Sequence, residues 1–169
     1  MQQLYFQTII WQQIPFTLIA NDHALVYIST QKDFQTELTT RYGSVQLAAK
    51  ATPIISLAIT ELNNYFKQPS TPFTVPLEPL VATSFQKLVW QGLTTIPVGT
   101  TLSYQQLAQQ LKRPSSTRAV ASAVAKNPFL IMVPCHRIIR NDGQLGQYRS
   151  GSTLKAQLLA LETSQTNLT

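Results

Sequence analysis

The first half of the chain alternates short runs of β-branched and aromatic residues with turn-forming residues. The runs cover residues 4–10, 16–20 and 24–30, and they are separated by Pro15 and by Asn21-Asp22. Because such side chains favour extended backbone and the intervening residues favour turns, the pattern predicts three antiparallel strands. Apolar side chains then recur at helical spacing over residues 52–66, which predicts a helix after the strands.

A proline-rich segment follows this predicted helix. It contains Pro69, Pro72, Pro76 and Pro79. Since proline has no backbone N–H to donate, so dense a cluster excludes a helix or a central strand and predicts a linker. We therefore expect two domains, one at residues 1–80 that includes the linker and one at residues 81–169.

Three short helices are predicted in the second half, at residues 84–93, 104–111 and 118–125. Ser84 and Ser103 are the expected N-caps of the first two helices. The last two helices form a helix-turn-helix pattern, which many helical proteins contain. The third helix is almost without bulk, because its side chains include Ala119, Ala121, Ser122, Ala123 and Ala125. Such a helix fits either close packing against a neighbour or close approach to a narrow nucleic-acid groove.

The positive charge of the chain is confined to its second half. The formal net charge is +6. Residues 1–80 contain four basic and five acidic side chains, a net of −1, whereas residues 81–169 contain nine basic and two acidic ones, a net of +7. A basic half beside a near-neutral one indicates a polyanionic partner, although a basic surface that only aids solubility gives the same count.

The cysteine count restricts the chemistry. One cysteine excludes an intramolecular disulfide and a multi-cysteine zinc site, and with only two histidines beside it we expect no metal and no cofactor. The first residues lack the basic and apolar regions of a signal peptide, and no apolar window reaches the length of a membrane span. These features predict a cytoplasmic protein that does not bind membranes.

The single cysteine lies in a distinctive segment, Pro134-Cys135-His136-Arg137, which follows an apolar run at residues 129–133. We expect that run to be buried and extended, with Cys135 at the base of a pocket. A lone cysteine is more often a small buried apolar side chain than a nucleophile. Neighbouring side chains on an extended chain point to opposite faces, so Cys135 and His136 do not by themselves make a catalytic pair.

Together with the residues around it, this segment resembles the O6-alkylguanine-DNA alkyltransferases. The matching positions include Asn127-Pro128, Gly146, Tyr148, Gly151, Lys155 and Glu162, and upstream Trp90, Tyr104 and Arg118. The similarity covers nearly all of residues 80–163, whereas the first half is only weakly similar. It implies an α+β fold, with a small ribonuclease H-like N-terminal α/β domain and a mainly helical C-terminal domain containing a helix-turn-helix.

The resemblance also implies an activity, the irreversible, single-turnover transfer of an alkyl group from O6 of guanine in DNA to Cys135. In the family pattern Glu162 orients His136, and His136 takes the thiol proton through a bridging water. Tyr104 matches the tyrosine that hydrogen-bonds the base at N3, and Asn127 matches the residue that fixes the turn before the cysteine. O4-alkylthymine is a further candidate substrate.

The implied partner is double-stranded DNA containing O6-alkylguanine, bound through its minor groove by a monomer. Arg118 matches the arginine that fills the space left by the everted nucleotide. The other residues expected against DNA are Thr117, Ala119, Gln105 and Arg137, and those expected at the substrate pocket are Tyr148, Arg149, Ile138 and Val124.

Three residues of the loop after Tyr148 depart from the family pattern. Ser152 replaces a common leucine, and Arg149 and Ser150 stand where small residues are frequent. The range of accepted alkyl groups therefore stays open. A non-catalytic sensor of O6-alkylguanine is the alternative function, but such proteins lack the cysteine. A transcription factor would need large polar side chains on the third helix in place of the alanines.

Overall fold

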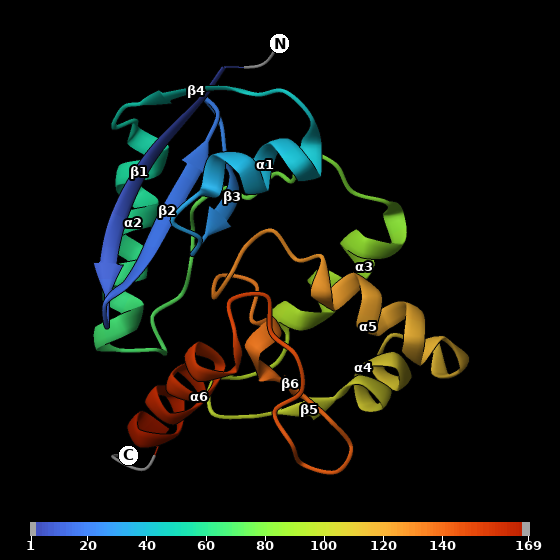
Figure 1. Cartoon of the computed structure of the whole chain (residues 1–169). Helices are drawn as coiled ribbons and strands as arrows, with labels where there is room; N and C mark the ends of the chain where they lie inside the picture. Colours follow the sequence, from blue (N-terminus) through green and yellow to red (C-terminus); the bar gives the residue numbers. More distant parts are fainter. Residues whose placement is uncertain (1–2, 167–169) are drawn as a thin grey trace. The chain divides into compact units, whose positions relative to one another are not determined.

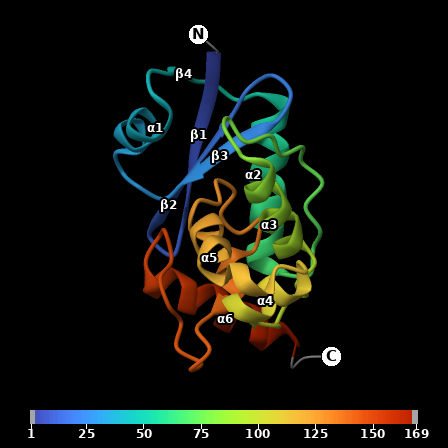
Figure 2. The ribbon, with the colours of Figure 1, turned by 90° about the vertical axis from the view of Figure 1, so that its right-hand side faces the viewer.

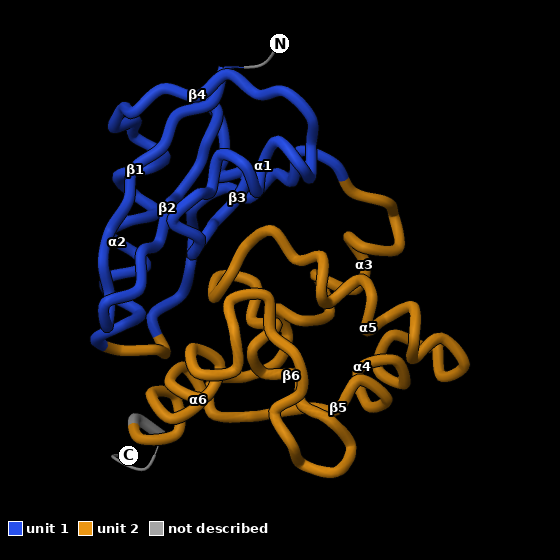
Figure 3. Tube along the Cα trace, in the orientation of Figure 1, with its two compact units in different colours: residues 1–67, 71–81 blue, residues 68–70, 82–169 orange. Residues whose placement is uncertain are grey.

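The computed structural model describes residues 3–166 of the chain, which divides into two compact units (Figures 1 and 3). Unit 1 comprises residues 1–67 and 71–81, and unit 2 comprises residues 68–70 and 82–169. The chain therefore passes from unit 1 into unit 2 for the last time between residues 81 and 82, directly after the proline-rich segment.

Unit 1 is built on a four-stranded sheet in the order β3-β2-β1-β4. The strands are β1 (Gln3–Trp11), β2 (Ile14–Ala20), β3 (Leu25–Ser29) and β4 (Gln46–Ala49). The three predicted antiparallel strands are confirmed, but β4 was not expected and pairs in parallel with β1, so the sheet is mixed. Pro15 does not separate the first two strands as predicted. It pairs with Ile10 inside β2, and the turn is made by Gln12 and Gln13, both at positive φ, as a two-residue hairpin turn requires.

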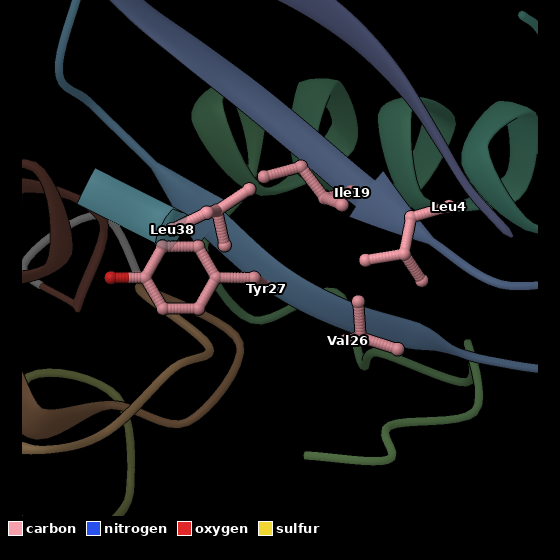
Figure 4. Packing of buried hydrophobic residues seen from close by; sticks show 5 residues of the cluster. All are labelled: Leu4, Ile19, Val26, Tyr27 and Leu38. Atoms are coloured by element: carbon pink, nitrogen blue, oxygen red, sulfur yellow. The ribbon is translucent and has the colours of Figure 1, made fainter. Parts of the chain in front are cut away.

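Two helices cover opposite faces of this sheet, α1 (Phe34–Tyr42) on one and α2 (Pro53–Lys67) on the other (Figure 2). The predicted helix at residues 52–66 corresponds to α2, which buries Ile55, Ala58 and Leu62. Helix α1 was not predicted. Its Leu38 completes the core cluster on its side of the sheet (Figure 4), which consists of Leu4, Ile19, Val26, Tyr27 and Leu38.

The proline-rich segment is irregular, as predicted, but one buried carboxylate fixes its middle to unit 1. Glu61 of α2 accepts hydrogen bonds from the backbone N–H groups of Thr74 and Val75 and from the Thr74 hydroxyl. The backbone of Leu25 in turn donates to Pro76 and accepts from Glu78. Residues 74–78 are thus held along the edge of β3 although they form no strand of their own.

Unit 2 is mainly helical, with α3 (Ser84–Thr94), α4 (Tyr104–Gln110), α5 (Thr117–Ala125) and α6 (Ser152–Thr166). The three predicted helices agree with α3, α4 and α5 to within one residue at each end. Ser103 caps α4 as expected, whereas α3 is capped by Thr83 and not by Ser84. A short parallel pair, β5 (Leu102–Ser103) with β6 (Ile138–Ile139), was not predicted. None of the helices within residues 3–166 is long and apolar enough to cross a membrane.

The turn after α4 contains a strained lysine and provides a stability prediction. Lys112 adopts a φ of 56°, in the left-handed region that favours glycine, while its N–H donates to the Gln109 carbonyl. Because a side chain there costs about 1 kcal/mol, we expect Lys112→Gly to raise the free energy of unfolding by up to that amount. Lys112→Ala retains a side chain at this positive φ and is expected to leave the free energy of unfolding unchanged. Urea denaturation of both variants measures the difference, and equal stability of the two would contradict it.

Candidate active site

The segment before Cys135 is a compact turn. Residues 129–133 are buried, as predicted, but they are not extended, and that prediction was wrong. Val133 donates its N–H to the Phe129 carbonyl at 2.9 Å, and Met132 donates to Leu130 at 2.9 Å. Ile131 has a φ of 72°, which is unusual for a β-branched residue and marks local backbone strain. The turn reverses the chain and brings Cys135 back toward Asn127.

One buried amide, Asn127, holds this turn and reaches the sulfur. Its Oδ1 accepts from the Phe129 N–H at 2.9 Å, and its Nδ2 donates to the Val133 carbonyl at 2.8 Å. The same Nδ2 lies 3.1 Å from Sγ of Cys135. The expected role of Asn127 in fixing the turn therefore has a defined geometry, and it includes a hydrogen bond that favours the thiolate over the thiol.

Cys135 begins a short 3₁₀ helix, η2 (Cys135–Arg137), and is only 6% exposed. Burial raises the pKa of the thiol, while the Asn127 hydrogen bond and the positive charges of Arg149 and Lys155 lower it. Because burial is the largest of these effects, the resting sulfur is a thiol that must lose its proton before it can act as a nucleophile. A nearby proton acceptor is required.

A buried imidazole and carboxylate lie on the next residue and on α6. Nε2 of His136 is 2.7 Å from Oε1 of Glu162, and both side chains have an exposure of 0%. Burial lowers the pKa of His136, although Glu162 opposes this effect. His136 is therefore a neutral imidazole at neutral pH, oriented by the carboxylate as the resemblance implied.

Arg137 completes this group, and its predicted contact with DNA is not supported. Its Nε and Nη2 each donate to Glu162 at 2.9 Å, and its Nη1 donates to the Ile96 carbonyl. With its side chain 9% exposed, the guanidinium neutralises a buried carboxylate and is turned away from solvent. Arg137 was expected against DNA because it is a cation in the basic half of the chain, but charge alone does not distinguish a buried ion pair from a surface cation.

Lys155 is a buried cation near the site for which no role was predicted. It is fully buried on α6, and its Nζ donates to the backbone carbonyls of Ile138, Leu145 and Gln147. Three carbonyl acceptors require three N–H donors, so the amine is an ammonium ion. Lys155 thus ties β6 to the loop that leads to Tyr148. A spacing of seven residues between Lys155 and Glu162 is the sequence signal that could have placed both on one helix face, but it does not show that the face is buried.

Two tyrosines lie near the sulfur. The pKa of Tyr104, at the start of α4, is raised by burial and by the charge that Cys135 acquires as a thiolate. The pKa of Tyr148 is raised further by the same causes, and its buried hydroxyl has no hydrogen-bond partner within the described residues. Both phenols are therefore protonated and are potential donors to a group bound beside Sγ.

The other residues predicted at the substrate pocket are Arg149, Ile138 and Val124, and each lies in a different environment. Arg149 reaches the Pro128 carbonyl at 3.5 Å and acts electrostatically on Cys135. Ile138 is fully buried, and its carbonyl accepts from Lys155. Val124 is buried on the inner side of α5, beside Val120 and Ala123. Their assignment to a substrate pocket stays a prediction.

The solvent-exposed side of helix α5 carries mostly small side chains. Its exposed residues are Arg118, Ala119, Ser122 and Ala125, whereas Thr117 is partly buried, and Gln105 is exposed on α4. The inner side of α5 is held by Trp90 of α3, whose indole N–H donates to the Ala123 carbonyl at 2.8 Å. Ala123 therefore packs against α3, as the first interpretation of the alanines expected, whereas Ala119 and Ala125 are exposed and their approach to a nucleic-acid groove stays a prediction.

No group of three or more His, Cys, Asp or Glu side chains placed to hold a metal ion occurs in the part of the chain that the structure describes. The side chains around Cys135 supply a buried thiol, a histidine hydrogen-bonded to a carboxylate, buried cations and two protonated phenols.

Comparison of the sequence with known proteins identifies a matching family and several similar proteins. The family described as "6-O-methylguanine DNA methyltransferase, DNA binding domain" matches residues 84–164. The inducible methylated-DNA–protein-cysteine methyltransferase of Bacillus subtilis is 34% identical over 163 residues, which cover 94% of this chain and 90% of that protein. The bifunctional transcriptional activator/DNA repair enzyme Ada of Escherichia coli is 50% identical over 104 residues, but the match spans only 29% of its length.

Solved structures agree with these relatives. The crystal structure of Mycobacterium tuberculosis O6-methylguanine methyltransferase superposes with a TM-score of 0.80 at 34% identity, covering 96% of this chain and 94% of that one. A structure of M. tuberculosis OGT in complex with DNA gives a TM-score of 0.80 at 36% identity with the same coverage. The similarity at this coverage extends over both units of the fold.

Proposed function

Because this chain belongs to the methylated-DNA–protein-cysteine methyltransferase family, we propose that it repairs DNA by direct reversal, taking the alkyl group from O6-alkylguanine onto Cys135. The observation that carries this proposal is the buried thiol, contacted by Asn127 and followed in sequence by the oriented His136. In the reaction an S–C bond forms while the C–O6 bond breaks, and the bonding electron pair stays on guanine O6. The thiol proton leaves through the protein and finally neutralises the guanine.

The proton path follows from the ion pair on Glu162. With two hydrogen bonds from Arg137, Glu162 is an ionised acceptor, so Nε2 of His136 carries the imidazole proton. Nδ1 is then the basic nitrogen. Cys135 and His136 are consecutive in η2, where successive side chains diverge by about a third of a turn. We propose that one water molecule passes the proton from Sγ to Nδ1, in the manner of a catalytic triad with a water link.

The leaving guanine needs a hydrogen-bond donor. The phenol of Tyr104 is protonated and electrostatically coupled to Cys135, which supports its proposed contact with N3 of the base. Tyr148 and Arg149 are further proposed contacts from the loop. The positive charge of Arg149 lowers the pKa of Cys135, and a charge on Cys135 raises the pKa of Tyr148, so both side chains lie near the sulfur. These contacts stabilise the charge that develops on the base as the alkyl group leaves.

DNA binding is assigned to α5, in a helix-turn-helix with α4. A minor groove about 6 Å wide admits only a slim element, and the exposed side of α5 carries alanine and serine beside Arg118. Arg118 then occupies the space left by the everted nucleotide, whose extrusion costs a few kcal/mol. Thr117, Ala119 and Gln105 are the proposed neighbours of the DNA backbone.

A mass measurement tests the reaction. Incubation with a duplex containing O6-methylguanine should add about 14 Da to the peptide that contains Cys135, since one methyl group replaces one proton. Cys135→Ser is the matched control and should remain unmodified. Tight binding of the damaged duplex without any mass change would reject transfer and favour the non-catalytic sensor.

The arginine assignment has its own test. Arg118→Ala is expected to slow transfer from a duplex by about tenfold or more, because the everted state loses the side chain that fills the stack. Transfer from the free base O6-benzylguanine involves no eversion and should change much less. Single-turnover rates with the two substrates measure the ratio, and equal slowing would remove Arg118 from this role.

The lowered pKa of His136 predicts how the rate of alkyl transfer depends on pH on the acidic side. The relay needs neutral imidazole, so the transfer rate should fall only as the pH drops below the ordinary histidine value of 6.5. The free energy of unfolding should fall over the same range, because the unfolded chain then binds a proton that the folded chain does not. Rates from pH 5 to 8 with O6-benzylguanine check this, and a midpoint above pH 7 would contradict it.

The remaining assignments concern the whole protein. We propose a cytoplasmic monomer in which residues 81–169 carry DNA binding and transfer and residues 1–80 form a supporting domain. The mixed sheet of unit 1, with three antiparallel strands and a parallel fourth, supports its placement in the ribonuclease H-like class. O4-alkylthymine stays a candidate second substrate.

A further inference from the structure

A polar groove lies between α4 and the chain that leaves β6. Strands β5 and β6, which pair side by side (Figure 1), contribute Leu102, Ser103 and Ile139 to its lining, and its volume is about 480 Å³. The side chains that line it are mostly amides and hydroxyls, together with one cation. They include Ser103, Gln105, Gln106, Gln109, Arg140 and Asn141. This composition is unlike that of a site for an apolar small molecule, where apolar and aromatic side chains dominate.

Such a lining fits a sugar–phosphate backbone. Carboxamides and hydroxyls donate to phosphate and sugar oxygens without reading the base, and arginine binds phosphate through two parallel N–H groups. The side chain of Arg140 is 57% exposed, so its guanidinium is available to a partner in the groove. Gln105 and Asn141 already hydrogen-bond to each other at 3.1 Å and connect the two walls.

The groove adjoins the reaction site through Gly146. A Cβ atom on Gly146 would lie 3.2 Å from Cγ of Arg140 and 3.8 Å from the hydroxyl of Tyr104. The stem of Arg140 and the phenol proposed to contact the everted base therefore meet at the same point of the loop. The groove residue Arg140 and the phenol of Tyr104 therefore both lie beside the same glycine.

Arg140 has an internal partner that resembles a phosphate. Its Nη2 lies 3.0 Å from Oδ2 of Asp142, whose side chain is 45% exposed. An ion pair as exposed as this is weak and exchanges readily. The other oxygen, Oδ1 of Asp142, accepts from the Gln144 N–H at 3.0 Å, which keeps the carboxylate beside Arg140.

We propose that this groove holds a phosphodiester of the damaged strand next to the everted nucleotide, with Arg140 as its ligand and Asp142 as an internal competitor. The inference rests on the proposed function, since it assigns a path to the same DNA. On binding, Arg140 exchanges the Asp142 carboxylate for a phosphate, and Asp142 limits the affinity by occupying and opposing that position.

Duplex affinity and its salt dependence test the proposal on the full chain. With a duplex containing O6-methylguanine as the probe and Cys135→Ser in every chain to prevent transfer, Arg140→Gln should weaken binding by about three- to tenfold. It should also reduce the slope of log K against log salt by about 0.9, the loss of one phosphate contact. Asp142→Asn keeps the hydrogen bond to Gln144 and should tighten binding about two- to threefold at low salt. In the double variant the gain from Asp142→Asn should largely disappear.

Lys87→Gln removes an exposed cation of α3 outside the groove and is the matched control. If Arg140→Gln changes affinity and slope no more than Lys87→Gln does, the groove assignment is overturned. The outcome is separable from the proposed function. If Cys135 becomes methylated but Arg140→Gln binds DNA as tightly as the unmodified chain, the repair activity stands and the groove assignment is rejected. If Arg140→Gln weakens binding but Cys135 is never methylated, the groove assignment stands and the repair activity is rejected.

Discussion

Replacing Glu162 with glutamine is expected to lower the free energy of unfolding by roughly 3–5 kcal/mol, because Arg137 is left as a buried cation without its counter-ion. The same change should slow alkyl transfer by about a hundredfold or more, since His136 loses the charge that orients it and favours its protonated form. Chemical denaturation and single-turnover transfer measure the two effects. Transfer at the wild-type rate would exclude Glu162 from the proton relay.

Two companion variants separate fold from chemistry. Glu162→Gln combined with Arg137→Met removes both charges and should recover much of the stability without recovering transfer. Glu61→Gln alters the other buried carboxylate, which binds only backbone N–H groups and a hydroxyl in unit 1. It should cost stability and leave the transfer rate per folded molecule unchanged. Recovery of transfer by the double variant would mean that stability alone explained the loss.

Lys155→Met should cost roughly 2–4 kcal/mol, because the carbonyls of Ile138 and Leu145 lose a charged donor and are left partly unsatisfied. The loop that carries Tyr148 and Arg149 is then released from β6. Since Lys155 also lowers the pKa of Cys135, transfer should slow by about tenfold, and higher pH should partly compensate for that loss.

Arginine at this position retains the charge but not the geometry. Its planar fork does not match three converging carbonyls, so Lys155→Arg should recover only part of the stability. Lys87→Met, at an exposed position on α3, is the control for loss of a lysine and should change stability by less than about 0.5 kcal/mol. Full stability of Lys155→Met, measured by urea denaturation, would show that the three hydrogen bonds contribute nothing.

Elements with clear local signals were predictable from the sequence. The antiparallel strands were found from runs of β-branched and aromatic residues between turn formers, and helices α2 and α3 from apolar side chains at helical spacing. Helices α4 and α5 were found mainly from their N-cap residues and from the proline between them. Helix α1 has one fully buried residue, Leu38, and short edge strand β4 has none, so neither produced a clear pattern. The run at residues 129–133 was misread because a short apolar run does not distinguish a buried strand from a buried turn.

The catalytic residues were predictable from the resemblance to the O6-alkylguanine-DNA alkyltransferases, whose pattern implied the roles of Cys135, His136 and Glu162. Residue types alone did not predict them, because a lone cysteine is more often a small buried apolar side chain. The partners of the cations were not predictable. Arg137 and Lys155 look like any basic residue in sequence, and only the fold shows that they are buried against a carboxylate and three carbonyls.

The hydrogen bond from Trp90 to Ala123 has a consequence for spectroscopy. The chain contains two tryptophans, and Trp11 belongs to unit 1, where it stacks on Phe66. The indole of Trp90 is the one joined to the back of α5, on the side away from Arg118. Any displacement of that helix alters the polarity sensed by this chromophore, so its emission provides a built-in optical readout of the element assigned to DNA.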